Sequence, residues 1–490
     1  MKKILYLIVA TSLLSGAYTS TKAQSDSTFT LEQSIAFALK NRASLAATRT
    51  QLNEADARIG EIRAMGLPQV NAAVEVGNNF IQQKTLIDTR AFGSPQVLNE
   101  FVITPEQINS GQSITLTPTY SAPEPVPGSG LQAITFVQPY TGSFVVTGSQ
   151  LLFDGSYLIG LKAAGTYAEL SRKNVQQSEI EVAEQVSKAY YGVLVNRERM
   201  ALLNQNLYRL DTLLSQTKIM FQNGVAEKLD VDRLQVSRNN LFVEQQKTAR
   251  LLELSEGLLK FQMGLPQQEP IVLTEGLAEV QDEIMQSIPA DFDYSNRIEY
   301  SILETQRDLA ELDLKNIRSG YLPKLYANAR YGYNGVGDSF GDVMKVRAGK
   351  DNFTDRNWFD FGYVGAQLQI PIFDGLRRHY QIQQAKARLE RTRFGFDALE
   401  QAIDLELRQA SVTLVNALAM IEAQQENLEL AEEIARVAKI KFQEGVGSNL
   451  EVVTAETELR QAQTNYYAAL YDALIAKVDL GRAAGTLLNK

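Results

Sequence analysis

The chain has 490 residues, a formal net charge of −9 at pH 7 and an apolar fraction of 44%. Its length exceeds that of one ordinary domain, and its acidic balance argues against a nucleic-acid partner. The sequence has no cysteine, which excludes disulfides, thiolate metal sites and a lipid-modified cysteine. Any histidine-based triad or metal site would depend on His379 alone, so we expect neither an enzyme nor a bound metal or cofactor.

The first 23 residues have the pattern of a secretory signal. Two lysines precede a short apolar run over 4–14, and a Thr-Lys-Ala triplet at 21–23 offers a small-residue cleavage site. The run is short for a membrane span, so an N-terminal anchor is the less favoured interpretation. No later stretch is apolar enough for a spanning helix. We therefore predict an exported chain that would enter a membrane only as β-structure.

Hydrophobic periodicity predicts the elements of the first part of the mature chain. Period-3.6 patterns indicate helices, and alternation such as Val70, Ala72, Val74, Val76 indicates strands. The expected order is a helix over 30–65, a strand over 69–80, a proline-rich outer loop, a strand over 134–153, a long helix over 154–221, a hairpin tip over 221–229 and a helix over 230–262.

The same order then recurs, which predicts a tandem duplication. FQNGVAEKLDV at Phe221 returns as FQEGVGSNLEV at Phe442, and the Phe-Asp-Gly and Leu-Pro pairs recur as well. The copies are expected over 24–289 and 290–490, joined by an acidic connector over 265–296 that we place at mid-height. Copy two should contain a helix, a strand over 324–334, an outer loop, a strand over 359–373, a long helix, a hairpin tip over 442–450 and a last helix.

Leucine spacing and element lengths predict how the helices pack. Steps of three and four, as from Leu203 to Leu207, Leu210 and Leu214, indicate coiled-coil-like packing. A 68-residue helix over 154–221 would span about 100 Å at ~1.5 Å per residue. Two shorter helices stacked end to end would match that length, so each copy should place one long helix beside two short ones.

The strands have the length, alternation and flanking aromatics of a transmembrane barrel. A half-buried sheet in a soluble domain would alternate in the same way, but the predicted signal favours the membrane. Four strands from one chain cannot close a barrel, so several chains must share one. The flanking aromatics are Phe80, Phe136, Tyr140, Tyr331, Tyr333, Trp358, Phe359 and Phe361.

The order and spacing of these motifs resemble the TolC-type outer-membrane efflux proteins over essentially the whole mature chain. The Leu-Pro strand entries, the two Phe-Asp-Gly turns, the paired FQ-G motifs and the ending LGRAAGTL carry the resemblance. It implies a mainly α-helical homotrimer with a 12-stranded outer-membrane β-barrel, four strands per chain, continued by a long periplasmic α-helical coiled-coil barrel. It also implies contact with outer-membrane lipid, and a passive exit duct served by a periplasmic adaptor and a proton-driven or ATP-driven inner-membrane pump.

The resemblance also assigns the hairpin tips a role. In the family, glycine-containing tip segments meet the hairpins of the adaptor. Two tight turns that need glycine would explain the same residues without any partner. The matching positions here are Gly224, Val225, Ala226, Gly445, Val446, Gly447 and Ser448.

Acidic residues just past the tips resemble those that narrow the family's tunnel. Like charges from three chains at a neck would repel anions and attract cations, although the helix dipole alone also favours an acid in a first helical turn. Phe442 and Gly447 replace the tyrosine and arginine of some relatives' closing network, so the nature of the latch stays open. The candidate gate residues are Asp230, Asp232, Glu451 and Thr454.

Two other functions compete with the duct. A secreted enzyme would need a phosphate loop or nucleophile motif, which we do not find. A structural periplasmic coiled coil or surface adhesin would explain the heptads but not the duplicated, aromatic-flanked strands. The cargo stays open among drugs, bile salts, metals, siderophores and polypeptides, because a wide duct needs little specificity of its own.

Overall fold

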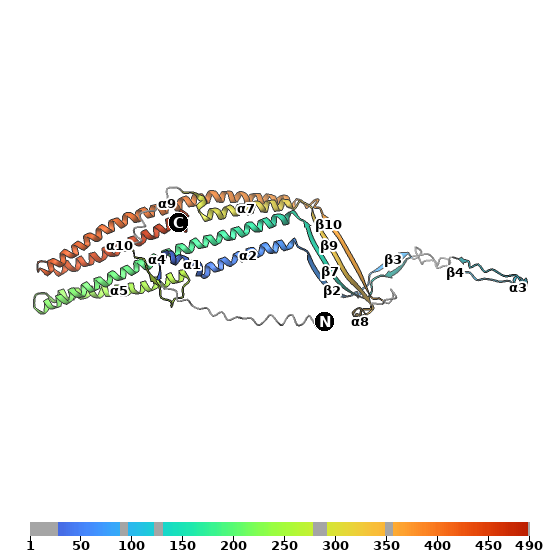
Figure 1. Ribbon diagram of the computed structural model, residues 1–490, viewed down its shortest axis with the longest axis horizontal. Coiled ribbons are helices and arrows are strands. Elements are labelled where there is room, and N and C mark those ends of the chain that lie inside the picture. The colour runs from blue at the N-terminus through green and yellow to red at the C-terminus, as the bar shows by residue number, and fades with distance from the viewer. Residues whose placement is uncertain (1–27, 89–96, 122–130, 278–291, 348–355, 489–490) are drawn as a thin grey trace. The chain divides into compact units, whose positions relative to one another are not determined.

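The computed structural model describes residues 28–88, 97–121, 131–277, 292–347 and 356–488 (Figure 1). It divides into a helical unit, Met1–Gly60, Gly160–Lys315 and His379–Lys490, and a sheet unit, Glu61–Ile159 and Asn316–Arg378. The predicted signal over 1–23 lies outside the described residues. Among the residues that are described, none of the helices combines the length and apolar character that crossing a membrane requires.

The helices of copy one break where the sequence predicts continuity. They are α1 (Leu31–Asn41), α2 (Ala43–Met65), α4 (Gly155–Gln222) and α5 (Lys228–Met263). The single helix expected over 30–65 is wrong, because Arg42 adopts an extended ψ of 121°. The end of α5 approaches the chain at this break. A Cβ on Gly264, whose φ is +77°, would lie 2.9 Å from the Asn41 carbonyl oxygen, so glycine is needed there.

The helices of copy two meet at a buried arginine. They are α7 (Ile298–Ser319), α9 (Arg377–Gln443) and α10 (Asn449–Ala483). Arg297, only 4% exposed, donates to the Ala483 carbonyl (2.8 Å) and pairs with Glu299 (3.0 Å) and Glu406 (2.9 Å). Burial alone would raise the pKa of Glu299, but the hydrogen bond and charge of Arg297 more than offset it and hold that pKa below its ordinary value. Arg297 thus joins the start of α7 and the end of α10 to the middle of α9.

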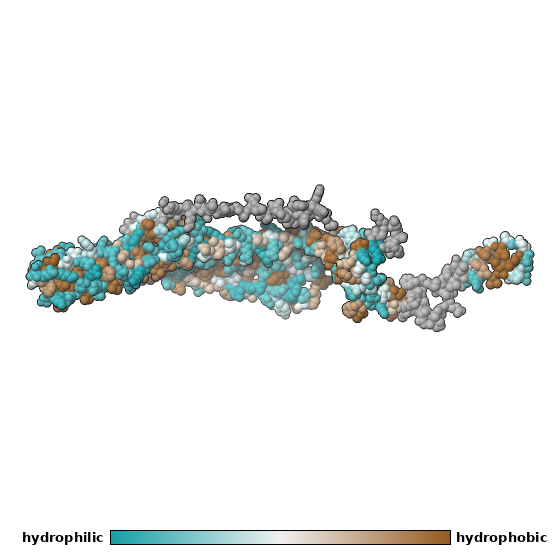
Figure 2. Space-filling view, turned by 90° about the horizontal axis from the view of Figure 1, so that it is seen from below, coloured by the Kyte–Doolittle hydropathy of each residue, from teal (hydrophilic) through white to brown (hydrophobic). Residues whose placement is uncertain are grey.

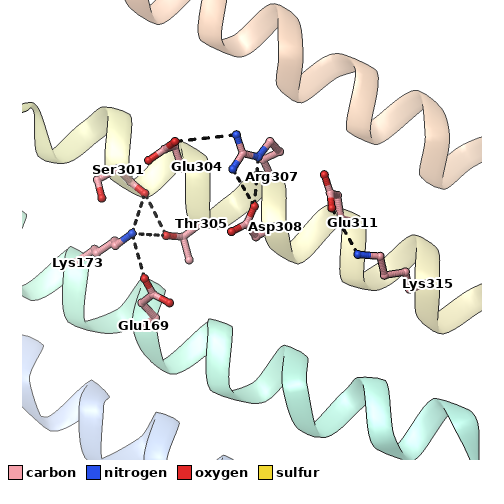
Figure 3. Close-up of polar contacts among 9 residues, drawn as sticks. All are labelled: Glu169, Lys173, Ser301, Glu304, Thr305, Arg307, Asp308, Glu311 and Lys315. Carbon is pink, nitrogen blue, oxygen red and sulfur yellow. Dashed lines mark hydrogen bonds and ion pairs between the residues drawn. The ribbon is translucent and has the colours of Figure 1, made fainter. Parts of the chain in front are cut away.

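A lysine on α4 holds α7 along the same unit. Lys173 donates its Nζ to the hydroxyl of Thr305 (2.7 Å) and the carbonyl of Ser301 (3.2 Å), and pairs with Glu169 (3.2 Å), as Figure 3 shows. Thr305 is 2% exposed, so the lysine spans a closed seam between the two helices. The other ion pairs in Figure 3 lie within α7 alone, for example Glu311 with Lys315 (3.6 Å).

Two clusters of buried apolar side chains fill the helical unit. The first surrounds Tyr190, whose hydroxyl donates to Glu275 (2.8 Å) and whose pKa burial raises above the ordinary value. The second lies closer to the hairpin turns, and it includes Leu203, Leu210 and Leu214 of the predicted seam. Its partners on the other helices are Leu234 and Leu241 on α5, Ala431, Ala435, Ala438 and Phe442 on α9, and Val452, Ala455, Leu459 and Ala462 on α10.

The connector between the copies is described in part. Its β8 (Val272–Leu273) pairs in parallel with β1 (Thr28–Phe29), and a short 3₁₀ helix covers Tyr294–Asn296. Thr30, directly after β1, forms a capping box with Gln33 at the start of α1. The stretch over 278–291 lies outside the described residues.

The sheet unit contains a four-stranded antiparallel sheet in the order β10-β9-β7-β2. Its strands are β2 (Gln69–Asn78), β7 (Tyr140–Phe153), β9 (Lys324–Gly337) and β10 (Trp358–Gln369). Copy one and copy two thus supply two strands each. Asp154, directly after β7, caps α4 by accepting from the Ser156 N–H (2.8 Å) and pairs with Lys324 (2.8 Å), which fixes this strand-to-helix turn.

Prolines explain two differences from the expected strand bounds. The strand expected over 134–153 divides at Pro139, which has no N–H for a ladder, into β6 (Leu131–Thr135) and β7. The strand expected over 359–373 ends at Gln369, two residues before Pro371. The strands expected over 69–80 and 324–334 end at Asn78 and Gly337.

The segment expected as an outer loop between β2 and β7 has structure of its own. β3 (Lys84–Asp88) pairs with β6, β4 (Val97–Leu98) pairs with β5 (Tyr120–Ser121), and α3 (Pro105–Asn109) lies between the last two. Figure 2 shows apolar side chains gathered over residues 97–121. The exposed ones are Phe101, Val102, Ile103, Ile108, Ile114 and Leu116.

Candidate functional site

The first hairpin tip closes through a left-handed glycine. α4 ends at Gln222, α5 begins at Lys228, and Gly224 between them has φ +71°. The N–H of Val225 donates to the Met220 carbonyl at 2.8 Å, which satisfies an end group of α4. Gly224 therefore has a structural task that does not depend on any partner.

The second tip repeats this geometry. α9 ends at Gln443, α10 begins at Asn449, and Gly445 has φ +74°. The N–H groups of Val446 and Gly447 both donate to the Lys441 carbonyl at 3.0 Å. A Cβ on Gly447 would lie 2.8 Å from the Cβ of Lys441, so a larger residue at this position would require the turn to shift.

Apolar side chains project from both tips at matching positions. Val225 is 72% exposed and Val446, its counterpart 221 residues later, is 79% exposed. Leu229 and Leu450, the second residues of α5 and α10, are 51% and 52% exposed. Each tip thus carries two exposed apolar side chains at matching positions. Ala226 is half-buried, and Ser448 serves as the N-cap of α10.

Two of the predicted gate acids, Asp230 and Glu451, lie in the first turns of their helices. Asp230 is half-buried, and its carboxylate accepts from the N–H of Glu227, the N-cap of α5, at 3.2 Å. Glu451 is exposed, and its own N–H donates to the Ser448 hydroxyl at 3.2 Å. The helix dipole favours both acids. Asp230 therefore serves helix capping already, whereas the described hydrogen bonds leave the Glu451 carboxylate directed to solvent.

An open groove between α9 and α10 brings two candidates together. Glu451 and Thr454 line it with Glu433 and Glu458, and its volume is 570 Å³. Lys441 and aliphatic side chains, among them Leu450, form the rest of its wall. Asp230 and Asp232 lie on α5 and do not line this groove, and Asp232 is exposed there. One chain thus presents an acidic groove on one hairpin and separate acids on the other.

Sequence reasoning missed the polar residues that link the hairpins. Asn449 is buried and donates its Nδ2 to the Asp230 carbonyl at 2.9 Å. Further from the tips, Asn206 on α4 donates its Nδ2 to the Oε1 of Gln463 on α10 at 2.8 Å. The only sequence signal was a polar residue at a position of the helix seam. Over the described residues, no group of three or more His, Asp or Glu side chains is placed to hold a metal ion.

Comparison with known proteins decides the family. Residues 129–253 and 301–486 match the model of the family described as outer membrane efflux protein. The chain belongs to this family. It is 22% identical over 342 residues to the outer membrane protein TolC of Vibrio cholerae, which covers 69% of this chain and 75% of the relative. It is 25% identical over 347 residues to the alkaline protease secretion protein AprF of Pseudomonas aeruginosa, covering 69% and 68%.

Solved structures show the same fold. CusC superposes with a TM-score of 0.67 at 15% identity, covering 93% of this chain and 91% of its own. The open state of MtrE from Neisseria gonorrhoeae gives 0.64 at 16% identity, covering 93% and 88%. The predicted family and fold class are confirmed. The outer-membrane location and the export-duct function are confirmed at the level of the family, which consists of channel proteins, and the adhesin alternative is not favoured.

Proposed function

We propose that three copies of this chain form one passive outer-membrane duct for a tripartite exporter. This proposal rests on the two edge strands of the four-stranded sheet. β2 and β10 end the strand order, and they run in opposite directions because all neighbours are antiparallel. β10 of one copy can therefore pair with β2 of the next and preserve the alternation. Closure removes every open edge, as a bilayer requires, and three copies of four strands make a 12-stranded barrel.

The register of the sheet supports placement in a bilayer. Successive residues alternate between faces, so neighbouring rows across the four strands lie on opposite sides. One face is apolar and fits lipid, and the other is polar and fits a water-filled lumen. Two adjacent rows illustrate this: Val70, Gly148, Ala329 and Val364 on the apolar face, then Asn71, Thr147, Arg330 and Tyr363 on the polar face.

The hairpin tips supply the inner end of the proposed duct. Asp230 and Glu451, at matching positions of the two hairpins, place acids from every copy near one level, with Asp232 and Thr454 close by in sequence. Such rings would attract cations and repel anions at a neck. The exposed Val225 and Val446 offer apolar contacts to the hairpins of a periplasmic adaptor, which would link the duct to an inner-membrane pump.

The pump sets the cargo in this proposal. The relatives include proteins named for protease secretion, AprF and PrtF, and channels such as TolC and MtrE. These names do not specify how a pump is driven, so a proton-driven and an ATP-driven pump both fit this proposal.

Membrane fractionation and crosslinking test the duct directly. The tagged protein should appear in the outer membrane as a crosslinked trimer that migrates differently before and after boiling. Gentle crosslinking in cells should also recover an adaptor and a pump, and the class of pump would identify the cargo class. A monomer outside the outer membrane would overturn the proposal. A trimer without an adaptor, under conditions that retain other envelope complexes, would overturn its tripartite part.

A further inference from the structure

Asn449 is a buried amide that is only half satisfied. It is 3% exposed, and its Nδ2 donates to the carbonyl oxygen of Asp230 at 2.9 Å, across 219 positions of sequence. Its Oδ1 is also buried and has no hydrogen-bond partner among the described residues. Val452, one turn further along α10, and Leu234, one turn beyond Asp230, are both fully buried in the second cluster. The amide therefore lies in an apolar seam between α5 and α10.

The repeat does not explain this residue. The counterpart of Asn449 in the first hairpin is Lys228, which is exposed at the first position of α5. Leaving the buried Oδ1 of Asn449 without a donor costs more free energy than the hydrogen bond of its Nδ2 contributes. An apolar side chain of similar size would avoid that cost. Asparagine therefore makes the contact between the hairpins weaker than its apolar surroundings would allow.

We propose that Asn449 is a positioning residue that sets how easily the two hairpin tips of one chain separate. When the tips are together, Nδ2 holds the start of α5 and Oδ1 is left dry. When the tips separate, water reaches both atoms and Oδ1 accepts a hydrogen bond from it. The seam within one chain, between α5 and α10, is then a place at which the duct opens. This inference rests on the proposed function, because it takes the tips as the narrow end.

Two substitutions with opposite expected effects test this role. Asn449→Leu removes the unpaired acceptor and suits the apolar seam, so the closed tips gain stability. Asn449→Asp keeps the shape but loses the Nδ2 donor and places a carboxylate against the Asp230 carbonyl, so the tips separate more readily. We expect single-channel recordings of the purified protein to show open probability falling about tenfold for Asn449→Leu and rising about tenfold for Asn449→Asp.

The opposite signs separate a positioning role from damage to the fold. Asn465→Leu, an exposed asparagine on the same helix bonded to Gln461, is the matched control and should behave like the unmodified chain. Unchanged gating in both Asn449 variants, or a shift in one direction for both, would overturn the proposal. If Asn449→Asp does not assemble, the direction of Asn449→Leu decides.

Failure of the proposed function would look different. The unmodified protein would then form no conducting channel at all. Hydrogen exchange of the backbone amides over 230–234 would still report on the seam in that case. Slower exchange in Asn449→Leu and faster exchange in Asn449→Asp would support the weak seam, and equal rates would reject it.

Discussion

Replacing Arg297 should loosen the start of α7 far more than replacing its counterpart in the first copy. Arg297 is buried, donates to the Ala483 carbonyl, and pairs with Glu299 and Glu406 at 3.0 and 2.9 Å. Arg297→Ala would leave a buried carbonyl and Glu299 without their partner. Loss of one member of a buried pair costs about 3–5 kcal/mol.

Solvent reduces that cost here. The Glu299 and Glu406 side chains are 26% and 41% exposed, so water can replace part of the lost interaction. We expect a local loss of about 2–3 kcal/mol, which corresponds to amide exchange roughly 30-fold to 150-fold faster over residues 294–302.

The duplication supplies the matched control. Arg42 lies 255 residues earlier, before α2, and its guanidinium donates to the side-chain oxygen of the neutral Gln185 at 2.7 Å. Arg42→Ala should therefore change exchange at the start of α2 by no more than about fivefold. Hydrogen exchange with mass spectrometry on the intact protein measures both regions in one experiment. Equal effects at the two sites would refute the idea that the carboxylates make Arg297 special.

Three further predictions concern acid stability, ion selectivity and the adaptor. The pKa of Glu299 is held below its ordinary value in the folded protein, so its ion pair adds to the free energy of unfolding. That contribution is complete above about pH 4.5 and is lost as the pH falls through the lower folded pKa. Glu299→Gln should therefore narrow the difference in the free energy of unfolding between pH 6 and pH 3. The pair Asp230→Asn and Glu451→Gln should lower cation selectivity in planar bilayers, and unchanged reversal potentials would reject these acids as the neck. Val225→Asp with Val446→Asp should cut adaptor crosslinking about tenfold while the trimer persists; undiminished crosslinking would place the adaptor elsewhere.

Much of the architecture follows from patterns within a few residues of each other. Alternation and helical spacing reveal the strands and long helices because each depends on which face of a local element is buried. Gly224 and Gly445 mark the hairpin turns because left-handed backbone strongly favours glycine wherever it occurs. The recurrence of these local signals in the same order also revealed the two copies and the family.

The errors lie where distant segments meet. The break at Arg42 has no proline or glycine to signal it, and it coincides with the close approach of Gly264, more than two hundred positions later. The strand pairs within the expected outer loop rest on short runs whose alternation was too weak to recognise.

The candidate site also has parts that the sequence predicts and parts that depend on contacts between distant segments. The tips, with their glycines and first-turn acids, could be placed from sequence, because turn closure and helix capping are local. The acidic groove that gathers Glu451 with Glu433, and the link from Asn449 to Asp230, could not, since each joins different helices. Local patterns determine which elements form and where they turn. Packing between elements far apart in the chain decides which side chains become neighbours, because burial and hydrogen-bond partners exist only once those elements are in contact.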